Sequence, residues 1–347
     1  MQCAEAERAG AGAERSPWDS GLAWILPAAG LTLAAFGVGL GLAWAWAHCL
    51  EPRPPDPRAP AAVWITDRDA HRVWGLDRNL LVVREVGMRA PIEVEACSDH
   101  GAWVVGALDG DPLGRHQLAR LDPAGMVTAR APLGALMDLA LCEQDGAIVV
   151  DLGPTGARVS EFDAGAGILW QRDWPGAACA AAAGRWVLVG GSSGGLARFD
   201  RGTPSAAPLL VAWGSSVADV APGPTADTWW ALDAGSGHRL ALLGADLSAR
   251  WTRATQISAL HLAPVPGKEQ VWLADSTLPL VRRYGSGGVL EIERSDMAQG
   301  GLDRAAALAG GGALFTTPGA LLSLDAWGRN APGQGGFDFL VDVAVGP

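Results

Sequence analysis

The sequence predicts an all-β fold made of seven similar units. Apolar strand cores recur at steps of 39 to 45 residues, around Trp64, Trp103, Ile148, Val187, Trp230, Trp272 and Leu314. Each core is followed by a turn, another strand, a Gly- or Asp-containing turn and a short outer strand. Four short strands repeated at this period are typical of a β-propeller. We therefore expect a seven-bladed β-propeller over residues 62–347.

The strand after each core ends in an apolar residue, usually followed by Asp, and forms the third strand of its blade. These segments are residues 73–77, 117–122, 158–163, 195–200, 239–244, 281–285 and 321–325. The innermost strands are the runs of small residues before the last six cores, at 92–97, 137–142, 176–182, 216–221, 257–263 and 302–309. Ala and Gly dominate these runs, as crowding around a central axis requires.

The first blade has no inner strand of its own in the sequence before it. A Pro-rich stretch precedes Val63, whereas LVDVAV at residues 340–345 has the inner-strand pattern and no blade after it. We expect residues 340–345 to pair with residues 63–66 and close the ring, which removes two open sheet edges.

The sixteen Trp of the chain fall mostly within these apolar strands. A broad flat ring fills the wedge between neighbouring sheets of a propeller, so we expect most of them to pack in the core.

The N-terminal part of the chain differs sharply in composition. Residues 1–20 are rich in Ala, Glu and Arg and read as a mobile tail. Residues 21–47 contain no charged residue and are longer than the roughly 20 residues that span a bilayer, with Trp18 and Trp24 at one end and Trp44 and Trp46 at the other. A single transmembrane helix is predicted, followed by a Pro-rich linker at residues 48–61 that forms a stiff spacer.

The sequence also leads to an expectation for the side of the membrane on which the propeller lies. Arg8 and Arg15 before the span are matched by Arg53 and Arg58 after it, so the distribution of positive charge does not decide the orientation. Residues 45–47 also fit the A-x-A pattern of a secretory cleavage site, and a cleaved signal stays open beside an uncleaved signal anchor. Both alternatives place the propeller outside the cytoplasm, on the periplasmic side in a bacterium, as a single-pass membrane protein.

Charge and cysteine content exclude some classes of function. The net charge of −11 argues against nucleic acid as a partner, because a phosphate backbone demands a basic face. The five Cys contain no C-x-x-C and no nearby His pair, which argues against zinc. Cys97 and Cys142 occupy corresponding places in neighbouring inner strands, so buried thiols and a disulfide between them are both open.

Four hairpins carry a family resemblance. The segments WITDRDAHRVWGLD (64–77), VVDLGPTGARVSEFD (149–163), WALDAGSGHRLALLG (230–244) and WLADSTLPLVRRYG (272–285) resemble NHL repeats. The matching acidic positions are Asp67, Asp151, Asp233 and Asp275, and the matching basic positions are Arg72, Arg158, Arg239 and Arg282. The resemblance implies a β-propeller. Asp and Arg are expected to pair across each hairpin as structural ion pairs, with His71 and His238 as hairpin residues.

Five of the seven predicted inner strands could present a carboxylate towards the same end of the channel, namely Glu93, Asp138, Asp219, Asp303 and Asp342. Carboxylates gathered around one channel repel each other unless they bind a cation, pair with Arg304 or take up protons. Oxygen-only ligands favour a hard ion, so these residues form a candidate Ca²⁺ site at the channel mouth. A solvated rim without an ion is the alternative.

The sequence indicates no specific activity. We expect a membrane-tethered, extracytoplasmic binding or scaffold propeller that recognises a protein or glycan partner. The reason is that the sequence combines this fold with no known catalytic motif. One alternative is a metal-dependent hydrolase or lyase that uses the channel carboxylates, with His261 or His100 as acid or base. Another is an accessory subunit of a membrane complex, with Gly37 and Gly41 as a helix-packing step.

Overall fold

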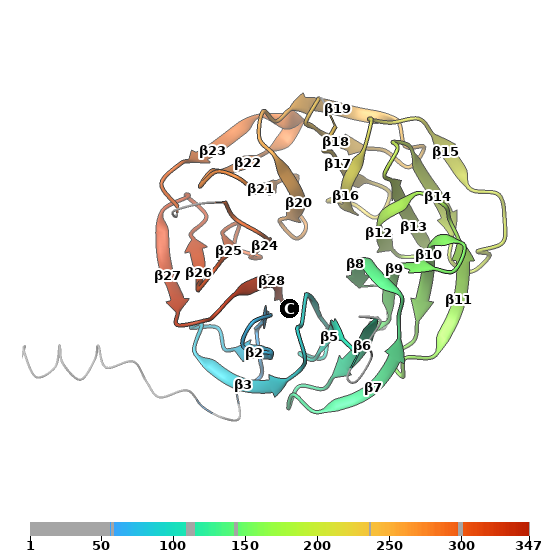
Figure 1. Ribbon diagram of the computed structural model, residues 1–347. Coiled ribbons are helices and arrows are strands. Elements are labelled where there is room, and N and C mark those ends of the chain that lie inside the picture. Colours follow the sequence, from blue (N-terminus) through green and yellow to red (C-terminus); the bar gives the residue numbers. More distant parts are fainter. Residues whose placement is uncertain are drawn as a thin grey trace, which may run out of the picture. The chain divides into compact units, whose positions relative to one another are not determined.

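Seven four-stranded antiparallel sheets surround a central axis in the computed structural model of the protein (Figure 1). The structure describes residue 56 and residues 59–108, 115–141, 145–235, 237–297 and 301–346. The seven sheets confirm the seven-bladed β-propeller predicted from the repeat. In each blade the strands run from the axis outwards as inner, second, third and outer strand.

The first three blades have the following strands. Blade 1 contains β28 (Leu340–Val345), β1 (Val63–Asp67), β2 (Arg72–Leu76) and β3 (Val82–Gly87). Blade 2 contains β4 (Glu93–Ala96), β5 (Ala102–Ala107), β6 (His116–Leu121) and β7 (Val127–Pro132). Blade 3 contains β8 (Ala135–Leu141), β9 (Ala147–Gly153), β10 (Gly156–Phe162) and β11 (Ile168–Asp173).

The other four blades follow in chain order. Blade 4 contains β12 (Ala177–Ala183), β13 (Trp186–Gly191), β14 (Leu196–Asp200) and β15 (Leu209–Val211). Blade 5 contains β16 (Val217–Pro222), β17 (Trp229–Asp233), β18 (Arg239–Leu243) and β19 (Ala249–Ala254). Blade 6 contains β20 (Ala259–Pro264), β21 (Val271–Asp275), β22 (Val281–Tyr284), the 3₁₀ turn η2 (Ser286–Gly288) and β23 (Leu290–Arg294). Blade 7 contains β24 (Ala305–Ala307), β25 (Ala313–Thr317), β26 (Ala320–Leu324) and β27 (Asn330–Gly335).

The ring closes through the last strand of the chain, as predicted. β28 pairs antiparallel with β1, with Val63 opposite Val345 and Ile65 opposite Val343. Figure 1 shows β28 at the axis, beside the first strands of the chain. The first and last segments of the propeller therefore share one sheet, and neither leaves an open edge toward the other.

The hydrophobic core is divided into seven clusters, each between two neighbouring blades. Trp64 of blade 1, for example, packs against Val94 and Val104 of blade 2. Trp64, Trp103 and Trp272 also donate an indole N–H to a turn carbonyl of the next blade, at His100, Asp145 and Gly311. Truncation of a buried Trp costs about 3 to 5 kcal/mol, whereas one such hydrogen bond contributes about 1 kcal/mol. Packing in the wedge therefore dominates, as the sequence indicated.

The Asp that ends the second strand of four blades holds the connection into the inner strand of the same blade. Asp67 accepts backbone N–H groups of Asp338 and Phe339 at 2.8 and 2.9 Å. Asp151, Asp233 and Asp275 accept from the equivalent connections, at Gly134, at Ser215 and Ser216, and at Ser258. All four Asp are buried. Each carboxylate supplies an acceptor for partly buried backbone N–H groups of the connecting segment.

The predicted Asp–Arg ion pairs are present in only two of the four hairpins. Arg158 pairs with Asp151 at 2.6 Å and Arg239 with Asp233 at 3.3 Å. In blades 1 and 6 the prediction is wrong, because Arg72 and Arg282 turn outwards to acidic residues of the adjacent outer strand, Glu85 and Glu293. In all four hairpins the Asp therefore binds backbone N–H groups, whereas the acidic partner of the Arg differs between blades.

A second repeated Asp begins the turn from the third to the outer strand. Asp122 accepts backbone N–H groups of Ala124 and Met126 at 2.9 and 2.8 Å. Asp77, Asp163 and Asp325 make the same two bonds in blades 1, 3 and 7. This turn explains why Asp follows the third strand in the sequence pattern.

Several predicted segments lie outside the described residues, namely the tail at 1–20, the membrane span at 21–47 and most of the linker at 48–61. Within the described part of the chain, no helix has the length and apolar character needed to cross a bilayer.

Candidate functional site in the central channel

One position of each inner strand defines a ring of seven side chains, which we name the channel layer. Its members, from blade 1 to blade 7, are Asp342, Glu93, Asp138, Cys179, Asp219, His261 and Arg304. Asp342, Glu93, Asp138 and Asp219 lie opposite the second-strand residue two positions after the repeat core, whereas Cys179 lies opposite Gly190, three positions after its core. In blades 1, 3, 4, 5 and 6 the register shifts at or beside this point, so a β-bulge re-aims the side chain.

Three Asp of the channel layer bind the next blade. Asp342 accepts the backbone N–H of Val94 at 2.8 Å. Asp138 and Asp219 make the equivalent bonds at 2.7 Å, with the N–H of Ala180 and of Leu262. In each pair the donor is the residue that follows the channel-layer position of the next blade. These carboxylates therefore join blade 1 to 2, blade 3 to 4 and blade 5 to 6 at their inner edges.

Arg304 of blade 7 is the cation of the layer. Its guanidinium donates to Glu93 Oε1 at 2.6 Å, and its Nε lies 3.7 Å from Asp342 Oδ1. On its other side Arg304 contacts His261 Nδ1, and the same His261 nitrogen lies 3.9 Å from Asp219 Oδ2. One Arg thus links four blades across the channel, and two of the acidic side chains share its charge.

The structure brings together four of the five carboxylates predicted from the sequence. Glu93, Asp138, Asp219 and Asp342 all line one channel cavity of about 490 Å³. Asp303 does not line this cavity and is exposed, because Arg304 occupies the blade 7 position instead. Among the described residues, no three channel carboxylates have oxygens within 4.8 Å of one another. The Ca²⁺ site stays a prediction, and its ligands are spread around the ring.

A further carboxylate in the cavity was not predicted. Glu95 lies one layer further along the channel, opposite the repeat core Trp103. The six equivalent positions are all alanine, at Ala140, Ala181, Ala221, Ala263, Ala306 and Ala344. The sequence did hold a signal, because Glu95 follows Glu93 by two residues in a strand and so shares its face.

Burial dominates the electrostatics of this cluster. It raises the pKa of Glu93 to about 8 against the attraction of Arg304, and it raises the pKa of Asp219 to about 6. Burial also raises the pKa values of Glu95 and Asp138 well above their ordinary values. The pKa of His261 is well below its ordinary value, first because of burial and then because of Arg304. The imidazole is therefore neutral beside the guanidinium.

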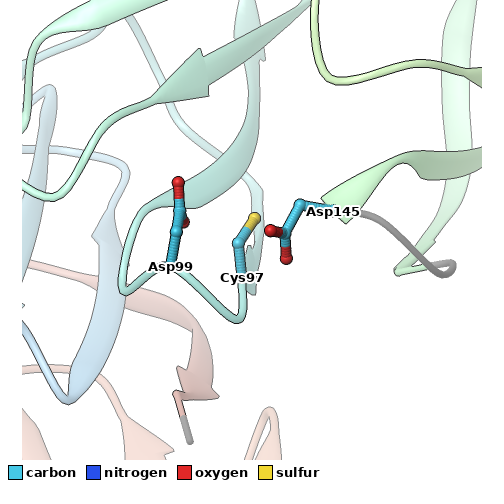
Figure 2. Close-up of side chains that lie close together, drawn as sticks. All are labelled: Cys97, Asp99 and Asp145. Carbon is cyan, nitrogen blue, oxygen red and sulfur yellow. The ribbon is translucent and has the colours of Figure 1, made fainter.

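A second group of potential ligands lies outside the channel. Figure 2 shows the carboxylates of Asp99 and Asp145 on either side of the Cys97 thiol, and the three ligand atoms lie within 4.8 Å of one another. Asp99 is bound by both oxygens to Arg120 at 2.8 and 2.9 Å, and Asp145 accepts from the N–H and hydroxyl of Ser98. The bonds of these two Asp clamp the turns of blades 2 and 3.

The Cys97 side chain matches a structural thiol. Burial raises its pKa to about 12, so the sulfur stays protonated and is a poor metal ligand. Cys97 and Cys179 are both free and buried. Cys142, the residue with which a disulfide of Cys97 was left open, lies outside the described residues.

The His residues named in the enzyme alternative do not form one site. His261 belongs to the channel layer, whereas His100 lies in the turn between β4 and β5 at a φ of 69° and accepts from Trp64 through its carbonyl. His71 and His238 are hairpin residues with φ values of 57° and 37°, as expected. Of the two alternatives for the acid or base, His261 therefore lies beside the channel carboxylates, and His100 does not line their cavity.

Stability is expected to fall as the pH rises from 6.5 to 8.5. The folded pKa of Glu93 is raised from 4.5 to about 8, so its contribution is fully present below pH 4.5 and is lost as the pH passes through 8. In this window unfolding releases the proton, and the free energy of unfolding falls by about 1 to 2 kcal/mol. His261 offsets only a small part of this fall, because its imidazole is neutral in the folded protein and loses most of its proton in the unfolded chain as the pH rises from 6.5. Urea unfolding of the full-length protein in detergent measures the effect.

Glu93→Gln is the matched variant for this pH dependence. It removes the titrating group, so the slope of stability against pH should become shallower. A wild-type protein whose stability is constant or increases between pH 6.5 and 8.5 would contradict the assignment of Glu93 as a buried, protonated carboxyl.

Comparison with known proteins adds no family to this description: the chain matches no protein-family model and no curated protein.

Proposed function

We propose that the protein is a membrane-tethered, extracytoplasmic binding or scaffold propeller that recognises a protein partner. The observation that carries this proposal is that side chains of the channel layer are engaged in contacts within the ring. Three of its Asp bind backbone N–H groups of neighbouring blades, and Arg304 forms an ion pair with Glu93. Side chains engaged in this way stabilise the ring, which leaves the loops of the two faces as the surfaces for recognition. The uncharged stretch at residues 21–47 supports the tether.

One face of the propeller carries exposed apolar side chains suited to a protein partner. The turns between third and outer strands all lie on this face, where Ala62 also leads into β1. Their tips include Met126, Val289 and Trp327, which are 66%, 58% and 78% exposed. Large apolar and aromatic side chains at loop tips are typical anchors of protein interfaces.

The test compares two variants of the full-length protein, solubilised in mild detergent and used to recover partners by cross-linking from native membranes. In the first variant Met126, Val289 and Trp327 are replaced by Ser. In the control, the outer-strand residues Ile168, Leu169 and Leu210, which are also exposed, are replaced by Ser. The proposal predicts a partner that the wild type and the control recover and the first variant does not. Equal recovery by all three proteins would contradict it, and binding of an isolated glycan in place of a protein would assign the partner to the other class.

The two alternatives predict different outcomes. A metal-dependent hydrolase or lyase would lose activity when Asp138 and Asp219 are replaced by Asn, and it would need a metal held by these residues. An accessory subunit would lose its complex when residues 1–50 are exchanged for an unrelated anchor. The NHL resemblance of the four hairpins is compatible with all three functions, because one fold hosts many activities.

A further inference from the structure

Second-strand side chains fill each wedge between two neighbouring blades. In five of the seven wedges one of them is a fully buried Trp, at Trp64, Trp103, Trp229, Trp230 and Trp272. In the wedge between blades 3 and 4 the corresponding residues are Ile148 and Val187, and an ion pair between Glu161 and Arg201 crosses this wedge instead. Six wedges are therefore filled by an indole ring or by a pair of long charged side chains.

The wedge between blades 7 and 1, which we name the closing wedge, has smaller side chains in these places. Figure 1 shows its two blades side by side, coloured red and blue. Leu314 and Val63 stand where five other wedges have a Trp, and Ser323 takes the third-strand position that Glu161 has in blade 3. A cavity of about 580 Å³ results on the loop-tip face.

This cavity has an apolar floor and a polar rim. Its walls include Val63, Leu80, Leu314, Ser323, Pro332 and Val345. The side chains at the floor are buried, whereas Arg78 and Asn79 of the β2–β3 turn are exposed at the rim. Trp74 and Phe337, the aromatic residues of the closing wedge, pack against each other at a centroid distance of 6.2 Å and line no part of the cavity. A concave site of this volume with apolar walls and a few polar groups is typical of a binding pocket.

An aromatic ring is the group that fits the cavity best. Leu314 corresponds to Trp64, whose indole donates to the carbonyl of His100, just before the second strand of the next blade. In the closing wedge the corresponding segment is formed by Ala62 and Gly346, and both line the cavity. A ring inserted from outside therefore lies where the indole of Trp64 lies in its own wedge.

Charge and position indicate the source of such a ring. Arg78 is exposed and forms no ion pair with any described residue, so it favours an acidic group beside the ring. The β26–β27 turn carries Trp327, which is 78% exposed, and it is flanked by Ser323 and Ala331 of the cavity wall. The cavity is thus continuous with the loop-tip surface to which the proposed function assigns the partner.

We propose that the partner protein inserts one aromatic side chain into this cavity, with an Asp or Glu of the partner beside Arg78. The inference rests on the proposed function and deepens it, since it names the chemistry by which the partner is recognised. Aromatic anchors that fill a desolvated pocket supply much of the binding energy of protein interfaces. The ring of the partner completes the packing of the one wedge that has neither a Trp nor a charged pair at the positions compared above.

Indole-3-propionate, which combines an aromatic ring with a carboxylate, is the probe for the cavity. Isothermal titration of the full-length protein in mild detergent, corrected for detergent alone, should show binding. Leu314→Trp should weaken this binding by about tenfold or more, because the new indole occupies the cavity, and it should melt no lower than the wild type, because cavity filling stabilises a core. Arg78→Glu should weaken the binding by about tenfold, since it reverses the charge at the rim. Arg78 is exposed, so this variant decides the outcome if Leu314→Trp fails to fold. Leu169→Ser, on the outer strand of blade 3, is the control and should bind as the wild type does.

The same variants are then tested for recovery of the partner by cross-linking from native membranes. The wild type and Leu169→Ser should recover the partner, and Leu314→Trp and Arg78→Glu should not. A partner that Leu314→Trp recovers and the variant with Ser at the three loop tips loses would overturn this pocket and leave the proposed function standing. Binding of the probe without recovery of any partner would make a free aromatic acid the ligand and overturn the partner as the occupant. Absence of probe binding to the wild type, or equal binding by Leu314→Trp and Arg78→Glu, would overturn the pocket itself.

Discussion

A chain that lacks residues 338–347 is expected to lose its folded propeller. The deletion removes β28, whose Leu340, Val343 and Ala344 are buried. Burial of such side chains contributes about 1.5 to 3 kcal/mol each for Leu and Val, and the backbone bonds to β1 are lost as well. The sum approaches the whole stability of a typical domain, which is about 5 to 15 kcal/mol. The exposed edge of β1 should also promote association between molecules.

Size-exclusion chromatography and circular dichroism of the detergent-solubilised chain measure this result. The truncated protein should elute as aggregate and melt without a cooperative transition. A synthetic peptide of residues 336–347 should restore part of the native signal when added during refolding, whereas a scrambled peptide should not. A monodisperse truncated protein with an unchanged melting temperature would show that the ring does not depend on β28.

Replacement of Arg304 by Met is expected to destabilise the propeller by about 3 to 5 kcal/mol at pH 8.5. Removal of one partner from a buried ion pair leaves the other charge without compensation, and Arg304 is the cation that contacts Glu93 and Asp342. The loss should be smaller at pH 6, because Glu93, whose pKa is already raised to about 8, is then neutral. The double variant Arg304→Met/Glu93→Gln should recover part of the loss.

Urea unfolding at pH 6 and pH 8.5 measures these changes in the free energy of unfolding. Arg329→Met is the control, since Arg329 is 74% exposed and pairs with Asp325 on the surface, where one ion pair contributes about 0 to 1 kcal/mol. An Arg304 variant that unfolds like the control at pH 8.5 would mean that the channel carboxylates do not need this cation.

The sequence predicted the fold more fully than the site. Blade number and ring closure follow from local patterns, because the position of LVDVAV after the last blade left residues 340–345 without a sheet of their own. The channel contacts depend instead on how neighbouring blades are placed. The bond from Asp138 to the N–H of Ala180, for example, joins two sheets with no backbone pairing between them.

Blade 7 shows most clearly where prediction of the site from the sequence fails. Asp303 and Arg304 are adjacent, and a shift of one residue in a strand exchanges the face on which each side chain lies. β24 is only three residues long, Ala305–Ala307, so the apolar pattern did not determine the register. The same reasoning explains the Asp–Arg hairpins, where the sequence predicted partners but the choice between Asp67 and Glu85 for Arg72 depends on the outer strand.

Amide hydrogen exchange of the full-length protein tests most directly the central claim, that the acidic channel layer joins neighbouring blades. The comparison is between the wild type and Asp138→Ala. The backbone N–H of Ala180 donates to Asp138, so its exchange should accelerate by about tenfold or more in the variant. The N–H of Leu262, which Asp219 holds, should exchange at the wild-type rate. Unchanged exchange at Ala180 in Asp138→Ala would contradict a structural role of the channel carboxylates.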